Sequence, residues 1–189
     1  MNADRLRFDL IVFDFDGVLT DNHVLVLENG LEAVVCNRSD GLAFDMLRKA
    51  DMPVLILSTE GNKVVAARAK KLRVPLLQGV VNKHKALVNY CSENGMRLKR
   101  TLFVGNDLND LEPMQAAGWR ACPSDAHPRI RKICHFKLKA KGGQGVVREL
   151  AESVLGLNYL TDKPQKGVNH DHVGRNRLRN RGRNAILGF

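Results

Sequence analysis

Cysteine is scarce in this sequence and lacks the spacings that cysteine-based sites require. Its four cysteines, Cys36, Cys91, Cys122 and Cys134, are scattered along 189 residues without a C-x-x-C pair. Neither a zinc site nor a disulfide framework is therefore predicted. Reduced, structural thiols are typical of cytosolic proteins, so we expect a cytoplasmic protein.

Long apolar runs are also missing. No segment approaches the ~20 apolar residues that are needed to cross a bilayer. Asp4 and Asp9 interrupt the first residues, which argues against a secretory signal. We therefore expect neither a signal peptide nor a membrane-spanning segment.

Acidic residues are outnumbered, with 20 Asp and Glu against 30 Lys and Arg, for a net charge of +10. Residues 162–189 hold seven basic and two acidic residues, which is half of this excess. This segment has few large apolar side chains, and no aromatic residues are interleaved with its arginines. We therefore expect a disordered tail at 161–189 and no nucleic-acid site. Residues 1–160 are long enough to form a single domain.

Short apolar runs alternate with helix-like segments along residues 8–157. Strands are expected at 10–13, 53–57, 74–77, 101–104, 119–122 and, as an edge strand, 135–138. Helices are expected at 41–50, at 62–72 and from 83 to 94. Three more are expected: one that follows residues 105–110 and ends at 117, a short one that begins at 123–126, and one from 146 to 155. This alternation every 20 to 25 residues predicts an α/β fold with a doubly wound parallel sheet.

One insertion interrupts the alternation after the first strand. Residues 23–28 and 31–36 are rich in β-forming side chains and are joined by Asn29-Gly30. This pattern predicts a β-hairpin with a two-residue type I′ turn. The hairpin has more apolar positions than a solvated ribbon needs, so we expect it to form a subunit interface.

Two aspartates follow the first strand directly. Asp14 and Asp16 lie two residues apart, so on an extended segment both project to one side and can converge on a cation. Gly17 then allows a sharp turn close to a bound group. Taken alone, such a pair is more typical of an Asx-rich turn.

Three later features also lie at strand ends or helix starts. Ser58 follows the second strand and could bind an oxyanion at a helix N-terminus or simply cap that helix. Lys83 begins a helix, where a lone lysine is usually solvated. Residues 105–110, Gly-Asn-Asp-Leu-Asn-Asp, follow the fourth strand and could form either a metal site or a helix-capping box.

In chain order, these four motifs resemble those of the haloacid dehalogenase (HAD) superfamily of phosphotransferases. The resemblance covers residues 8–157 and is strongest to a capless branch that hydrolyses phosphorylated 2-keto-3-deoxy sugar acids. The hairpin after the first motif is also similar to one found in that branch, and residues 139–149 resemble the branch's C-terminal Gly-Gly segment. It includes octulosonate (KDO) 8-phosphate phosphatases, nonulosonate 9-phosphate phosphatases and phosphatase-like domains attached to some sialic acid cytidylyltransferases.

The resemblance implies a phosphatase that forms an aspartyl-phosphate intermediate. It makes Asp14 the nucleophile and Asp16 the general acid and base, while Ser58 and Lys83 hold the phosphate. It also implies Mg²⁺, bound by Asp14, the carbonyl of Asp16 and the fourth motif. That motif has Asn106 where the family usually has an aspartate, so Asp107 is an alternative ligand.

The resemblance also implies a substrate and an assembly. The expected substrate-binding residues are Ser58, Thr59, Glu60, Arg68, Lys71 and Lys83. Arg68 and Lys71 lie on one helix face and could meet a substrate carboxylate across a subunit boundary, or form only a solvated basic face. The family's homotetramer would cover the site. The alternative function is a weakly active or silent oligomerisation domain in sugar-nucleotide biosynthesis, favoured by Asn106.

Overall fold

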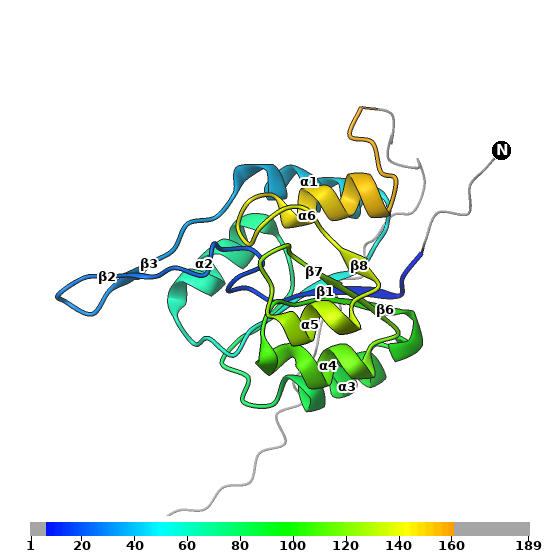
Figure 1. Cartoon of the computed structure of the whole chain (residues 1–189), viewed down its shortest axis with the longest axis horizontal. Coiled ribbons are helices and arrows are strands. Elements are labelled where there is room, and N and C mark those ends of the chain that lie inside the picture. Colours follow the sequence, from blue (N-terminus) through cyan, green and yellow to red (C-terminus); the bar gives the residue numbers. More distant parts are fainter. Residues whose placement is uncertain (1–6, 161–189) are drawn as a thin grey trace, which may run out of the picture.

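A central parallel sheet organises the chain in the computed structural model, which describes residues 7–160. The predicted tail at 161–189 lies outside the described residues. Six strands run in the order β5-β4-β1-β6-β7-β8 (Figure 1). They are β1 Leu10–Phe13, β4 Val54–Leu57, β5 Leu76–Leu77, β6 Thr101–Val104, β7 Trp119–Cys122 and β8 Phe136–Lys137. Because the chain moves outward from β1 first one way and then the other, the predicted doubly wound α/β fold is confirmed.

Helices cover both faces of this sheet (Figure 1). One layer contains α1 Arg38–Lys49, α2 Lys63–Leu72 and α6 Val146–Glu149, which a π-helical turn continues over Leu150–Val154. The other layer contains α3 Lys83–Glu93, α4 Leu111–Ala116 and α5 Pro128–Ile133, with short 3₁₀ turns at Leu98–Arg100 and Leu108–Asp110. A short helix was expected to begin at 123–126, and this starting point was wrong. Instead, α5 starts at Pro128, because the His127 side chain accepts a hydrogen bond from Arg129 N and proline suits the first helical position.

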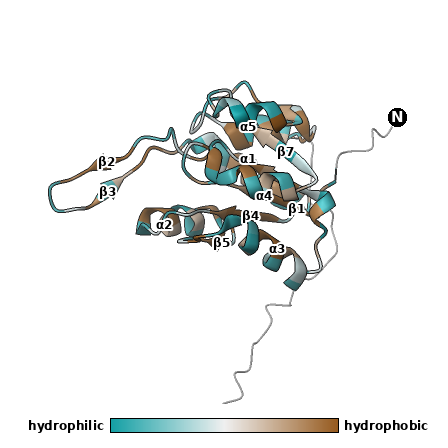
Figure 2. Cartoon of the chain, turned by 60° about the horizontal axis from the view of Figure 1, so that its bottom comes forward, coloured by the Kyte–Doolittle hydropathy of each residue, from teal (hydrophilic) through white to brown (hydrophobic). Residues whose placement is uncertain are grey.

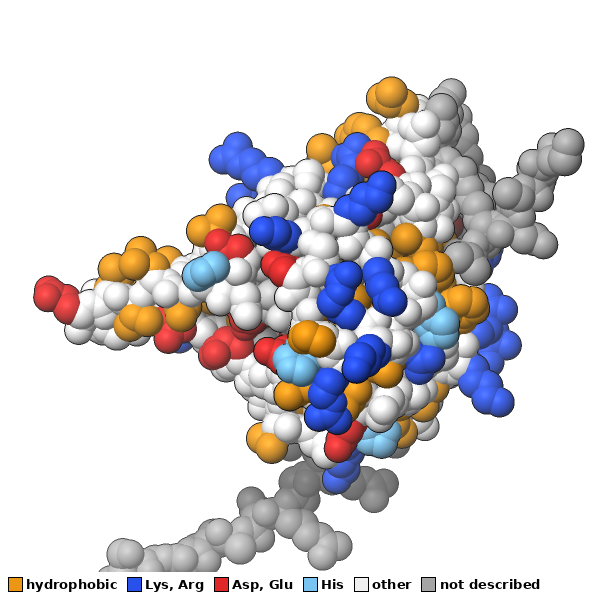
Figure 3. Space-filling model, viewed as in Figure 1, with side chains coloured by type: hydrophobic (Ala, Val, Ile, Leu, Met, Phe, Trp, Pro, Cys, Tyr) orange, Lys and Arg blue, Asp and Glu red, His pale blue; other side chains and the backbone are white. Residues whose placement is uncertain are grey.

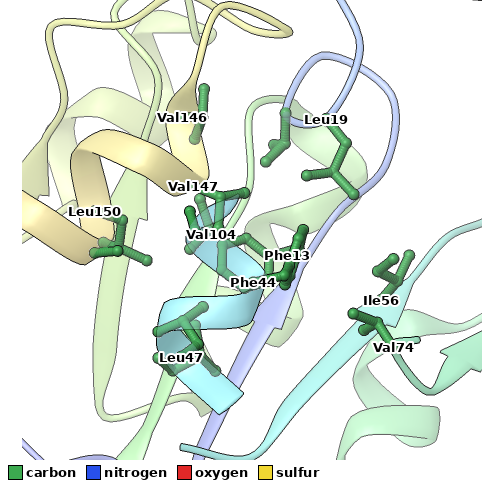
Figure 4. Close-up of a cluster of buried hydrophobic side chains, with 14 of the residues drawn as sticks. Phe13, Leu19, Phe44, Leu47, Ile56, Val74, Val104, Val146, Val147 and Leu150 are labelled. Carbon is green, nitrogen blue, oxygen red and sulfur yellow. The ribbon is translucent and has the colours of Figure 1, made fainter. Parts of the chain in front are cut away.

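The central strand β1 packs into both layers. Ile11 and Phe13 join the core under α1, α2 and α6, whereas Leu10 and Val12 join the core under α3, α4 and α5. The ring of Phe13 meets that of Phe44 edge-on, with centroids 5.3 Å apart (Figure 4). All four strand residues are fully buried, which explains why the run is apolar on both faces.

The hairpin after β1 consists of β2 Leu25–Val26 and β3 Glu32–Ala33. The predicted type I′ turn was wrong. Leu27 N donates to Leu31 O, Gly30 N donates to Leu27 O, and only Gly30 of the Asn-Gly pair has a positive φ. The loop therefore has three residues, as in a type I turn followed by a bulge with glycine in the left-handed region.

The hairpin projects from the body (Figure 2), and apolar side chains are exposed on it (Figure 3). These exposed residues are Val24, Leu25, Val26, Leu27, Leu31 and Val35. Leu25 is 63% exposed and Leu31 is 62% exposed. Exposed apolar side chains gathered on one projecting element are typical of an interaction site.

No helix between residues 7 and 160 is long and apolar enough to cross a membrane. All four cysteines are free thiols, of which Cys91 and Cys122 are buried.

The buried carboxyl group of Asp40 makes stability depend on pH. Burial raises the pKa of Asp40 to about 6, although the backbone N–H groups of Arg148 and Val147 oppose the shift. Because the folded-state pKa exceeds the unfolded value of 3.8, this group's stabilisation is complete below pH 3.8 and is lost as the pH rises through about 6. We expect the free energy of unfolding to fall by about 1 kcal/mol between pH 5 and pH 7.5 through Asp40 alone.

Urea unfolding of wild type and Asp40→Asn at both pH values would measure this contribution. The variant keeps the shape and an acceptor oxygen, so the Asp40 contribution to the pH dependence should vanish. If the two proteins lose the same stability between pH 5 and pH 7.5, the carboxyl group is not the cause.

Candidate active site

The carboxyl ends of β1, β4 and β6 lie side by side and bring the predicted site residues together. Phe13 pairs with Ile56 on one side and with Val104 on the other. A pocket of about 330 Å³ opens at this edge of the sheet. Its lining consists of Asp14, Asp16, Asn22, Thr59, Asn106, Asp107, Leu108 and Asn109. In an open α/β sheet this edge is the usual place for ligand binding.

A buried ion-pair triad forms the floor of the site. Lys83 Nζ lies 2.7 Å from Asp14 Oδ1 and 2.7 Å from Asp110 Oδ1. The three side chains are 1%, 6% and 0% exposed. The alternative of a solvated Lys83 was therefore wrong, because this first residue of α3 is buried and its ammonium group pairs with two carboxyl groups.

Burial and the neighbouring charges together set the charge state of the triad. Burial raises the pKa of Asp14 well above its usual range, Asp110 raises it further, and Lys83 opposes both. Burial alone would lower the pKa of Lys83, but the two carboxylates raise it. The lysine is therefore cationic, and its charge is shared between two buried carboxyl groups.

Asp16 lies above this floor on the loop that follows β1. Thr20 Oγ1 donates to Asp16 Oδ1 at 3.4 Å, and the carboxyl group is half-buried. Burial raises the pKa of Asp16, with a smaller contribution from Glu60, while the Thr20 hydroxyl opposes the shift. A raised pKa favours the protonated carboxyl group, which is the form that a general acid needs.

Asn106 is buried against Gly17. A Cβ atom on Gly17 would lie 1.9 Å from Asn106 Nδ2, so only glycine allows this contact. Asn106 is 7% exposed, and its Oδ1 is buried without a hydrogen-bond partner among the described residues. A buried acceptor that faces no donor is the arrangement expected of a cation ligand.

Asp107, the alternative ligand, is exposed and caps the 3₁₀ turn Leu108–Asp110. Its Oδ1 accepts a hydrogen bond from Leu108 N at 2.7 Å. Asp110 reaches back to Asp107 N, which completes a capping box. The capping interpretation of this motif is thus confirmed, and Asp107 still lines the pocket.

Ser58, Thr59 and Glu60 follow β4. Ser58 is 1% exposed, and its hydroxyl accepts from Glu60 N at 3.0 Å. The alternative that Ser58 caps α2 was wrong, because Asn62 is the capping residue. Thr59 lines the pocket with Asp14, whereas Glu60 lines a neighbouring pocket of about 200 Å³ that also contains Asp16.

The basic residues of α2 lie outside both of these pockets. Arg68 Nη2 donates to Asn37 O at 2.7 Å, and its Nε is buried without a described partner. Lys71 is exposed. Neither residue is brought to Asp14 within the chain, and their role in substrate binding stays a prediction.

Comparison with known proteins agrees with this geometry. A family model described as haloacid dehalogenase-like hydrolase matches residues 55–150. The 3-deoxy-D-manno-octulosonate 8-phosphate phosphatase KdsC of Escherichia coli K12 is 30% identical over 154 residues, which is 81% of each chain. The chain belongs to the haloacid dehalogenase-like hydrolases, as a phosphatase of the KdsC family.

Solved structures also match the phosphatase closely. A HAD family hydrolase from Streptomyces avermitilis has a TM-score of 0.78 and 43% identity, over 82% of this chain and 88% of the other. The KDO 8-phosphate phosphatase of Moraxella catarrhalis has a TM-score of 0.77 and 27% identity, over 80% and 88%. The latter structure is a complex with magnesium ion, phosphate ion and KDO.

Asp110 is the site residue of this phosphatase that sequence reasoning missed. Its Oδ2 accepts from Asn106 N at 3.0 Å, and a Cβ on Gly105 would lie 2.6 Å from it. The carboxylate thus fixes the backbone of the fourth motif and also holds Lys83. Asp110 is visible in the sequence as the last residue of Gly-Asn-Asp-Leu-Asn-Asp. Its ion-pair partner Lys83, however, lies 27 residues away in the sequence.

The donor set of the phosphatase fits a divalent cation. Asp14, Asp16, Asp110 and Lys83 carry a net charge of −2 when all are ionised, which repels a phosphate group. Between residues 7 and 160, no group of three His, Cys, Asp or Glu side chains is arranged to hold a metal. A cation here would therefore need an amide or carbonyl oxygen beside the aspartates, and the unpartnered Asn106 Oδ1 is such an oxygen.

Proposed function

We propose that this phosphatase hydrolyses the phosphate ester of a 2-keto-3-deoxy sugar acid, octulosonate 8-phosphate or nonulosonate 9-phosphate, with Mg²⁺ as cofactor. The supporting observation is the triad of Asp14, Lys83 and Asp110, with contacts of 2.7 Å beneath a pocket of about 330 Å³. The names of the similar KdsC enzymes support the substrate class.

In this mechanism the carboxylate of Asp14 is the nucleophile. Phe15 N and Lys83 Nζ both contact Oδ1, which leaves Oδ2 to attack phosphorus. The new O–P bond forms as the bond to the sugar oxygen breaks, giving an aspartyl-phosphate. Lys83 is proposed to offset the charge on the phosphate, and Ser58 and Thr59 are proposed to bind its oxygens.

Asp16 is proposed to move the protons. In the first step it protonates the departing sugar oxygen, for which its raised pKa is suited. In the second step the resulting carboxylate takes a proton from the water that hydrolyses the aspartyl-phosphate. A bound Mg²⁺ would be held by Asp14, the main-chain carbonyl of Asp16 and Asn106, and it would supply positive charge beside the phosphate.

The proposed site for the substrate carboxylate lies between subunits. Glu32 and Glu60 line the pocket beside Asp16, so within one chain that wall repels an acid group. We propose that Lys71 of a neighbouring subunit, together with Arg68, binds the carboxylate in a homotetramer joined through the exposed hairpin. Sedimentation velocity that finds only monomer at micromolar concentration would contradict this assembly.

Release of inorganic phosphate from a panel of sugar phosphates tests the function. We expect kcat/KM for KDO 8-phosphate or a nonulosonate 9-phosphate to exceed that for glucose 6-phosphate, which lacks a carboxylate, by at least about tenfold. Activity should disappear with EDTA and return with Mg²⁺. Metal-independent turnover would overturn the mechanism, and no release from any sugar acid phosphate would favour the silent accessory domain.

Asn106→Asp tests the metal assignment. The substitution adds a carboxylate at the buried oxygen that has no described partner. We expect the Mg²⁺ concentration for half-maximal activity to fall about tenfold, which corresponds to ~1.4 kcal/mol. The kcat at saturating Mg²⁺ should change less, because the other site residues are untouched.

Asp107→Asn is the matched comparison for this variant. The side chain of Asp107 is exposed and caps a turn. The Mg²⁺ concentration that Asp107→Asn needs for half-maximal activity should therefore stay near that of the wild type. The reverse pattern, with Asn106→Asp unchanged and Asp107→Asn losing Mg²⁺ affinity, would make Asp107 the ligand.

A further inference from the structure

The loop that carries Asp16 is a tight turn held by its own backbone. Leu19 N and Thr20 N both donate to Phe15 O, at 2.8 and 3.2 Å. Gly17 N donates to Thr20 Oγ1 at 3.2 Å. The position of the Asp16 carboxyl group therefore depends on the position of the whole turn.

A distant glycine pair, Gly142-Gly143, lies directly against the back of this turn. Gly143 N donates to Val18 O at 3.0 Å. A Cβ atom on Gly142 would lie 2.4 Å from Gly17 O, and one on Gly143 would lie 2.4 Å from Asp21 N. Two backbones approach this closely only where no side chain intervenes.

The glycine pair is itself fixed to the body of the protein from two sides. Gly142 N donates to Asp125 Oδ1 at 3.0 Å, from the segment after β7. On the other side the chain enters α6, where Arg148 N donates to Asp40 Oδ1 of α1 at 3.1 Å. The pair thus connects this turn with the segment after β7 and, through α6, with α1.

We propose that Gly142, Gly143 and Asp125 are positioning residues that hold Asp16 at the distance needed for proton transfer to the leaving group. The inference rests on the proposed function insofar as Asp16 is taken as the general acid. General acid–base catalysis contributes ~10²–10⁴-fold to the rate, and a displacement of about 1 Å can cost ~10²-fold. The turn has its own hydrogen bonds, so the glycine pair is needed to place it rather than to form it.

Gly142→Ala tests the proposal with two esters of different leaving groups. We expect kcat to fall about 100-fold with KDO 8-phosphate, whose sugar oxygen needs protonation, and less than about fivefold with p-nitrophenyl phosphate, which does not. KM should stay within about threefold for both. Asp16→Asn should give the same contrast between the esters. Gly41→Ala is the control, because its Cβ would lie 3.8 Å from Leu72 Cδ2 in ordinary contact.

Asp125 provides a second variant, because its exposed side chain can be changed without opening the core. Asp125→Ala should lower kcat with KDO 8-phosphate about tenfold, and Asp125→Asn, which keeps an acceptor oxygen, should restore it. Equal losses with both esters, or full activity in Gly142→Ala, would overturn the positioning role.

Amide hydrogen exchange separates this inference from the proposed function. In full-length Gly142→Ala, the amides of residues 17–20 should exchange at least about tenfold faster than in wild type and in Gly41→Ala. If the wild type hydrolyses neither ester, the proposed function fails and exchange alone decides the positioning role. Unchanged exchange in that turn would then overturn it.

Discussion

Asp14→Asn is expected to lower phosphate release by about 10⁵-fold or more, the scale of loss when a covalent nucleophile is removed. The amide keeps the shape of the side chain but is a far weaker nucleophile. Lys83 retains Asp110 at 2.7 Å, so the fold should persist with a melting temperature close to that of the wild type. Single-turnover assays with p-nitrophenyl phosphate, with circular dichroism alongside, would measure both quantities.

Asp9→Asn is the matched control, since Asp9 lies just before the same strand at its opposite end. It is paired with Arg97 and Arg100, away from the pocket. We expect turnover within about twofold of the wild type. An Asp14→Asn protein with near-normal turnover would rule out an aspartyl-phosphate at this position.

Lys83→Met should cost both activity and stability. Removing the ammonium group leaves Asp14 and Asp110 buried together without a cation. Breaking a buried ion pair in this way typically costs 3–5 kcal/mol, so we expect the free energy of unfolding to fall by about 4 kcal/mol at pH 7. Turnover should fall by at least ~10³-fold, because the charge that offsets the phosphate is also lost.

The pH dependence of this variant identifies the cause. Burial already raises the pKa of Asp14, and removing Lys83, which opposes that shift, raises it further. Because Asp14 then binds its proton more tightly in the folded state than in the unfolded state, stability should be partly regained at pH 5 and lost again as the pH rises. Lys85→Met, an exposed lysine on the same helix, should change neither stability nor activity. Equal stability of the two variants at pH 7 would contradict the ion-pair account.

The sequence by itself determined the sheet and the position of the candidate active site. The run Leu10–Phe13 is apolar at every position, which requires burial on both faces and hence a central parallel strand. Once the strands are parallel, residues that follow them must gather at one edge, so the proximity of Asp14, Asp16 and Asn106 was predictable. These properties depend on short-range patterns that each segment carries alone.

Only the tertiary structure decided which polar groups face one another. Lys83 could have been solvated, but its helix is packed so that the ammonium group meets Asp14 and Asp110. Arg68 was expected at a substrate carboxylate, yet within the chain it binds the carbonyl of Asn37. Gly142 lies against Gly17 across 125 residues of sequence. Such contacts depend on the angles and distances between packed elements, and no local pattern of residues encodes them.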